Sequence, residues 1–271
     1  MLKSWRLGRV FGFPVEINLS FLLLLALVFF AFGGLTGVLF VGLVFVFVLL
    51  HELGHALVAR RLGVHVSGIE LSFFGGAAKM TQMPRTPNHE IAIAAAGPAV
   101  SLMLGGIGFG LGMLVGSQLL VWAGFINFVL AAFNLIPALP MDGGRILRAL
   151  LARRMDYVRA TDISVQVARV VAIGFGAIGL VSMLSGAGWS QLLILAPFLW
   201  MMGTRERMVA RMAVDPYAGP GEDVFGRFAR PDRPEWGDRT AGSSDWPDGG
   251  APPRRFTIRR VGGRMVVEVL D

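Results

Sequence analysis

The sequence contains no cysteine, and this absence limits the chemistry that its side chains can offer. Disulfide bonds and thiolate metal sites are both excluded. Any metal held by the chain must therefore be bound by histidine, aspartate or glutamate. The chain has only four histidines, so the positions that could serve are few.

Charged residues are also scarce: they make up 16% of the 271 residues, whereas hydrophobic residues make up 54%. Residues 17–50 and 91–141 contain no Asp, Glu, Lys or Arg at all. Such a composition is typical of an integral membrane protein. The net charge of +7 does not indicate nucleic acid, because Lys and Arg cluster beside the apolar runs, as anchors to a cytoplasmic membrane surface do. We therefore expect the lipid bilayer, and not nucleic acid, as a partner.

The apolar runs predict about six transmembrane helices. We expect them at residues 17–33, 36–60, 91–115, from about 119 to the prolines near 137, and at 163–184 and 189–204. The breaks at 33–36, 115–118 and 185–188 are uncharged, whereas the other connections and both ends carry nearly all the Lys and Arg. By the positive-inside rule, we expect a multi-pass protein of the cell inner or plasma membrane with both termini cytoplasmic.

Three stretches outside the spans predict β-structure. Residues 1–16 are basic and alternate around a Gly/Pro turn, and residues 62–90 read as two short strands followed by a loop. Residues 256–269 alternate around Gly262-Gly263, a strong hairpin signal. The expected fold is an all-α polytopic membrane protein with a small interfacial β-sheet and a C-terminal β-hairpin. We expect four parts: 1–16, a membrane core at 17–204 with the 62–90 insertion, a flexible linker at 205–253, and the hairpin at 254–271.

The most informative motif is His51-Glu52-Leu53-Gly54-His55, which stands in the second predicted span. Residues four apart lie on one face of a helix, so both imidazoles can hold one Zn²⁺. Glu52 can then take a proton from a water that the metal activates. A chance match on a soluble helix would carry no function. Ionisable groups within an apolar span are costly and usually functional, and this favours the metal site.

A zinc site needs a third protein ligand, and Asp142 is a candidate. It is the first acidic residue after the long uncharged run, it follows a stretch broken by Pro137 and Pro140, and a carboxylate oxygen suits zinc. Alternatively, Asp142 caps the helix that begins after it. The chemistry of the residues alone does not separate these two interpretations.

Two motifs together resemble the site-2 protease family of intramembrane metalloproteases: HELGH at 51–55 and NLIPALPMDGG at 134–144. The segments GRVFGFPVEINLSF, FFGGAAKM and AAAGPAVSLML are also similar to that family, with Ser101 where Asn often stands. The resemblance covers about residues 5–205. It implies that His51, His55 and Asp142 bind one Zn²⁺, that Glu52 is the catalytic base, and that Asn134 contacts the substrate or its oxyanion.

The resemblance also implies the activity. We expect a zinc metalloendopeptidase that cleaves membrane-spanning protein substrates, such as anchored regulators already trimmed by another protease. Two alternatives come from other classes: a metal transporter that uses the same ligands as a transit site, and a catalytically silent homologue that binds membrane proteins. A transporter more often has paired broken helices in matching halves, which this sequence lacks, and a silent protein would not need Glu52.

Overall fold

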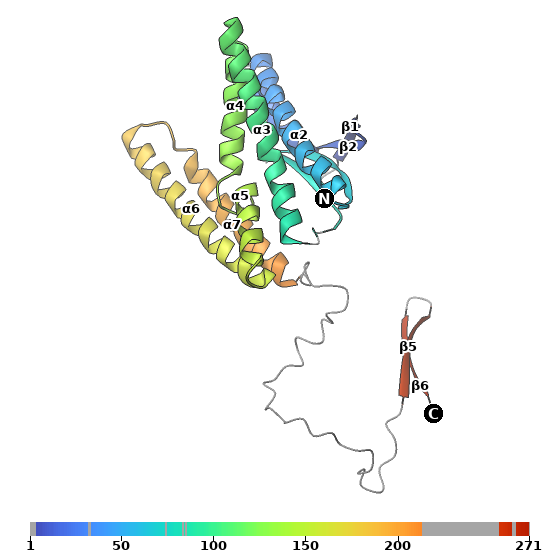
Figure 1. Cartoon of the computed structure of the whole chain (residues 1–271). Helices are drawn as coiled ribbons and strands as arrows, with labels where there is room; N and C mark the ends of the chain where they lie inside the picture. Colours follow the sequence, from blue (N-terminus) through green and yellow to red (C-terminus); the bar gives the residue numbers. More distant parts are fainter. Residues whose placement is uncertain are drawn as a thin grey trace. The chain divides into compact units, whose positions relative to one another are not determined.

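The computed structural model describes residues 4–31, 34–73, 75–82, 84, 86–212, 255–261 and 264–270. Within these residues the chain forms seven helices and six strands, in two units, residues 1–222 and 223–271 (Figure 1). The helices, all in the first unit, are α1 (Leu19–Ala31), α2 (Leu35–Arg61), α3 (Pro87–Val115), α4 (Gln118–Asn134), α5 (Asp142–Ala152), α6 (Tyr157–Ser185) and α7 (Leu192–Met212). The strands of the first unit are β1 (Ser4–Val10), β2 (Phe13–Asn18), β3 (Val66–Ser72) and β4 (Gly75–Met80).

The two predicted β-regions of the first unit join into one four-stranded sheet in the order β1-β2-β3-β4. β1 and β2 form an antiparallel pair, as do β3 and β4, and the two pairs meet where β2 runs parallel to β3. Helices α1 and α2 make the crossover between β2 and β3. The sheet packs on α2 through buried residues of β2 and β3, with Phe13 and Ile69 in the same core as Leu53, Ala56 and Ala59. The sheet therefore lies against the turns of α2 that carry the HExxH motif.

The helices α2, α3 and α4 lie side by side (Figure 1), and glycines let α3 and α4 approach closely. A Cβ on Gly112 would lie 2.6 Å from the Val121 nitrogen, and a Cβ on Gly124 would meet the backbone of Phe109. Small residues commonly permit such contacts between membrane helices. Gly116 ends α3 with a φ of 69°, a left-handed conformation that glycine adopts at little cost. The predicted break near this residue is confirmed.

Three helices among the described residues are long and apolar enough to cross a membrane: α2, α3 and α6. The helices α1 and α4 are apolar but shorter, with 13 and 17 residues. The first predicted span is shortened because β2 continues to Asn18, whose side chain accepts a hydrogen bond from the Ser20 N–H at 3.2 Å and so fixes the helix start. The structure thus confirms a core of several apolar helices but does not confirm that six of them span the membrane.

The third helix begins earlier than the sequence predicted, at Pro87 instead of residue 91. The Thr86 hydroxyl accepts a hydrogen bond from the His89 N–H at 3.2 Å, and Pro87 occupies the first helical position. Both features are favourable at a helix N-terminus, because they use or remove backbone donors that lack helical partners. The loop predicted at the end of the 62–90 insertion is therefore shorter.

The second unit contains β5 (Arg255–Val261) and β6 (Arg264–Leu270), which pair antiparallel with Val261 opposite Arg264. The turn predicted at Gly262-Gly263 lies outside the described residues, as does the predicted linker beyond Met212. The prediction that this linker begins at residue 205 is wrong, because residues 205–212 belong to α7. The hairpin as a functional unit therefore stays a prediction.

Candidate metal centre

Two histidines of α2 and one aspartate of α5 meet in the interior of the first unit. The Nε2 atoms of His51 and His55 lie 3.1 and 3.2 Å from the Oδ2 atom of Asp142. All three residues are buried, with 3%, 2% and 7% of their surface exposed. The structure thus brings together the three residues that the sequence nominated as metal ligands, from segments 87 residues apart.

The Nδ1 atom of each imidazole, on the ring side away from Asp142, contacts α3. The Nδ1 atom of His51 lies 2.9 Å from the Ser101 hydroxyl, and the Nδ1 atom of His55 lies 2.6 Å from the Ile93 carbonyl oxygen. A carbonyl oxygen can only accept, so the His55 Nδ1 donates to it, and in the neutral imidazole the Nε2 lone pair is then available for a metal. Such partners orient metal-binding histidines. The sequence alone does not predict the contacts of Ser101 and Ile93, because nothing local shows which face of α3 meets α2.

The backbone around Asp142 explains how its carboxylate reaches the histidines. α5 begins at Asp142, its N-cap is Met141, and no side chain caps it. A Cβ on Gly143 would meet the Leu135 carbonyl, and one on Gly144 would meet the backbone of Leu139. The two glycines therefore let the first turn of α5 lie directly on the preceding proline-containing loop. The helix therefore begins one residue earlier than the capping interpretation has it, and the Asp142 carboxylate contacts the two imidazoles instead of capping the helix.

Glu52 lies beside this cluster on α2 and is engaged by the edge of the sheet. Its Oε2 atom accepts a hydrogen bond from the Ala78 N–H of β4 at 2.9 Å. One nitrogen or oxygen atom from each of His51, Glu52 and His55 lies within 4.8 Å of the others. The next residue, Lys79, pairs instead with Glu70 and Glu16, and its hydrogen bonds lower the pKa of both carboxyls. Lys79 is thus occupied by these two carboxylates of the sheet.

Asn134, the other nominated residue, lies at the end of α4 and is half-buried. Its amide nitrogen donates to the Leu130 carbonyl of the same helix at 2.9 Å. That contact is local to α4, and no hydrogen bond among the described residues joins Asn134 to the histidine–aspartate cluster. An amide nitrogen carries a second hydrogen, which remains for another acceptor.

The donors fit a zinc ion. Two imidazole nitrogens converge on one carboxylate oxygen, which is the donor set of many zinc sites. The adjacent turn of α3 leaves room for it: a Cβ on Gly97 would clash with both Nε2 atoms, so only glycine keeps that space open. His51, His55 and Asp142 would hold the ion and leave one tetrahedral position to water or substrate.

Comparison with known proteins supports this assignment. The profile of peptidase family M50 matches residues 39–119 and 115–175. A Methanocaldococcus jannaschii protein named as a zinc metalloprotease is 38% identical over an alignment 201 positions long that covers 68% of this chain and 56% of that relative. The Mycobacterium tuberculosis protein Rip3 is 32% identical over an alignment 270 positions long that covers 84% of this chain and 69% of Rip3.

The fold is shared as well. The solved site-2 protease from Methanocaldococcus jannaschii superposes with a TM-score of 0.59 at 33% identity, over 76% of this chain and 95% of that one. The chain spans just over half the length of the first curated relative above. The apolar helices of this chain and its family relationship identify it as a membrane protein. The matched half of the sequence, the identity to Rip3 and the shared fold show that the chain belongs to peptidase family M50, the family of site-2 proteases.

Proposed function

We propose that this protein is an intramembrane zinc metalloprotease that hydrolyses peptide bonds in or near transmembrane segments of membrane-anchored proteins. The observation that carries the proposal is the convergence of His51 and His55 on Asp142, with Glu52 beside them, in a buried site on an apolar helix. Arg60, a basic residue near the end of α2, follows His51 by nine residues. At 1.5 Å per residue, the site lies about 13 Å inside that end of the helix.

In this proposal each residue has a distinct role. Bound zinc would acidify a water molecule and polarise the scissile carbonyl. Glu52 takes a proton from the attacking water and delivers it to the leaving amine, for which a half-buried carboxylate beside the ligands is suitably placed. Ser101 and the Ile93 carbonyl keep the imidazoles oriented. Asn134 uses its second amide hydrogen to stabilise the oxyanion once a substrate occupies the site.

The substrates follow from the depth of the site. A transmembrane helix hides its carbonyls in backbone hydrogen bonds, so it must unwind locally before cleavage. We propose single-span anchored regulators, already trimmed by another protease, as substrates. The transporter and silent-binding alternatives are less favoured, because Glu52 contributes nothing essential to either.

The membrane arrangement proposed with this activity has six spans, α1 to α4, α6 and α7, with both termini cytoplasmic. α5 lies at the cytoplasmic interface, and α1, about 20 Å long, crosses where the bilayer thins. Residues 213–253 act as a linker, because α7 continues to Met212, and residues 254–271 act as a hairpin.

This topology predicts the behaviour of reporter fusions. Fusions at residues 10 and 215 should behave as cytosolic, whereas a fusion near Gly116, the uncharged turn between α3 and α4, should behave as external. Enzymatic reporters that work on only one side of the membrane make the measurement. An external signal from the fusion at residue 215 would contradict the six-span arrangement.

The ligand assignment predicts loss of metal when the carboxylate is removed. The purified protein should contain one zinc per chain, and Asp142→Ala should lower the occupancy because two imidazoles remain as the only protein ligands. Metal analysis of purified protein measures this. Asp156→Ala is the matched control, because Asp156 is the N-cap of α6 and should not affect zinc. Full zinc content in Asp142→Ala would remove Asp142 from the ligand set.

A further inference from the structure

A buried ion pair joins α3 to α5, and the proposed chemistry does not use it. The Nε atom of Arg148 donates to the Glu90 Oε1 atom at 3.1 Å, and the Nη2 atom donates to the same oxygen. Only 4% of Glu90 and 5% of Arg148 is exposed. Arginine and glutamate are almost never buried to this degree unless they are paired.

The guanidinium of Arg148 also reaches the two helices that follow. Its Nη1 atom donates to the Glu206 Oε2 atom of α7 at 3.3 Å. Its Cζ atom lies 5.1 Å from the ring centre of Tyr157 in α6. One side chain of α5 therefore contacts three other helices.

Stability alone is a weak reason for such a pair. Desolvation of two charges offsets much of their attraction, and replacing a buried pair with apolar side chains is often neutral or stabilising. A buried pair can instead specify how two elements align. The alignment of α3 with α5 matters because both helices bring residues to the metal centre.

The buried face of α3 carries the residues that contact the two histidines. Glu90, Ile93, Gly97 and Ser101 are spaced by three, four and four residues, so they share one face of the helix. Ile93 and Ser101 hold the two imidazoles, and Gly97 makes room for their Nε2 atoms. Glu90 therefore extends, by about one turn, the same stripe that organises the histidines.

On the other side of the junction, Arg148 lies on the same short helix as Asp142. Asp142 and Arg148 belong to one helix of 11 residues and are separated by about 9 Å along its axis. A shift of Arg148 relative to Glu90 would consequently move the Asp142 carboxylate relative to His51 and His55.

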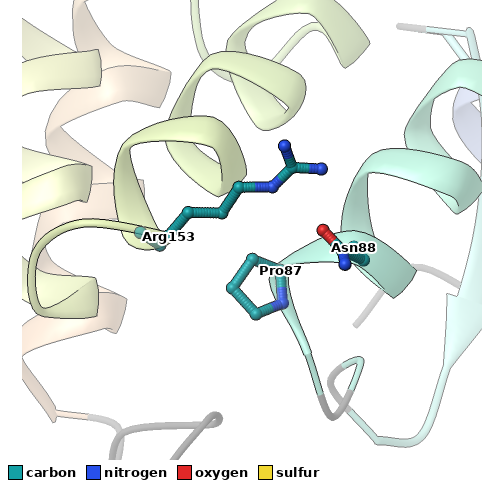
Figure 2. Close-up of a pocket in the computed structure, with 4 residues that line it drawn as sticks. Pro87, Asn88 and Arg153 are labelled. Atoms are coloured by element: carbon teal, nitrogen blue, oxygen red, sulfur yellow. The ribbon is translucent and has the colours of Figure 1, made fainter.

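The outer ends of α3 and α5 leave space between them. An open groove of about 550 Å³ lies there, lined by Pro87 and Asn88 of α3, by Ala152 of α5 and by the following Arg153. Figure 2 shows the Arg153 side chain extending from the end of α5 toward the first turn of α3. The Glu90–Arg148 pair is a buried polar contact about one turn from this groove, and it can set the spacing of the two helices.

We propose that Arg148, through Glu90, is a positioning residue that sets the placement of Asp142 relative to His51 and His55 and thereby the affinity of the site for zinc. This inference rests on the proposed function, because it assumes that these three residues hold the metal. Arg148 itself contacts neither metal nor substrate.

Two variants separate positioning from mere stability. Arg148→Met removes the guanidinium that pairs with the buried Glu90 carboxylate, so both the melting temperature and the zinc affinity should fall. The double variant Glu90→Met/Arg148→Met replaces the pair with apolar side chains, so the melting temperature should recover. The alignment is not restored, so its zinc Kd should stay about 10–100-fold weaker than that of the wild type, as for other residues that orient metal ligands.

The control is a second ion pair, more exposed than Glu90–Arg148, that joins two other helices. Asp162→Met/Arg207→Met removes the contact between the Asp162 Oδ1 and Arg207 Nε atoms, which joins α6 to α7 at 2.6 Å without involving α5. Its zinc affinity should equal that of the wild type. Competition with a chelator of known affinity gives each zinc Kd, and thermal unfolding of the same preparations gives the melting temperatures.

Cleavage kinetics at saturating zinc provide a further readout. The double variant at positions 90 and 148 should show a lower kcat with little change in KM, because the substrate is still bound but the site is misaligned. Wild-type zinc affinity in the folded double variant would overturn the positioning role while leaving the proposed protease intact. Failure of the wild type to bind zinc would overturn both.

Discussion

Replacing Glu52 with glutamine should slow cleavage of a membrane-embedded substrate at least about 100-fold while zinc stays bound. The amide keeps the size of the carboxylate and removes its ability to take a proton. General-base contributions are typically about 10²–10⁴-fold, and here the same group must also deliver the proton to the leaving amine. Zinc should remain because His51, His55 and Asp142 supply three ligands without Glu52.

The measurement is a time course of cleavage of a single-span substrate in detergent or liposomes, beside a zinc assay on the same preparation. Glu16→Gln is a suitable control, since Glu16 is a glutamate of β2 whose partners, Arg6 and Lys79, lie in the sheet. It should cleave at close to the wild-type rate. Near-normal cleavage by a zinc-loaded Glu52→Gln variant would refute the assigned base, even with proteolysis established.

Adding one methyl group at Gly97 should abolish zinc binding. A Cβ at this position would overlap the Nε2 atoms of both His51 and His55, closer than real Cβ atoms approach their neighbours. The imidazoles cannot simply rotate away, because Ser101 and the Ile93 carbonyl hold their Nδ1 atoms. Gly97→Ala should therefore lose both metal and activity.

The controls for this variant lie on the same helix. A Cβ added to Gly106 or Gly110 of α3 would have no neighbouring atom within 4 Å, so alanine fits at both. Alanine is preferred to glycine within a helix by about 1 kcal/mol, so these two variants should keep zinc and be at least as stable as the wild type. Zinc content measured after purification compares the three. Normal zinc in Gly97→Ala would show that the ion lies away from this turn of α3.

The sequence could predict the parts of the site that are encoded locally. The spacing of His51 and His55 identifies a helix face, and the uncharged runs identify apolar helices with breaks near Gly116 and residues 185–188. The local sequence does not decide whether Asp142 is a metal ligand or a helix cap, because both interpretations depend on the same few residues. The contacts of its carboxylate with α2 come from the tertiary structure.

Other features depend on long-range pairing that no local pattern records. β2 pairs with β3 across two intervening helices, with Val15 opposite Ile69. The contacts of Ser101, Ile93 and Gly97 arise from the rotation of α3 about its own axis, and a helix that is apolar on all sides gives no sign of which face turns inward. The pairing of Arg148 with Glu90 likewise joins residues 58 positions apart.

Zinc dependence can be measured on one preparation of the wild-type protein. The protein is reconstituted in liposomes with a single-span substrate, stripped with a chelator, and titrated with zinc while cleavage is followed. We expect no cleavage after stripping and full recovery as zinc approaches one ion per chain. Undiminished cleavage by the stripped protein, with its zinc content verified as zero, would contradict the assignment of a zinc protease.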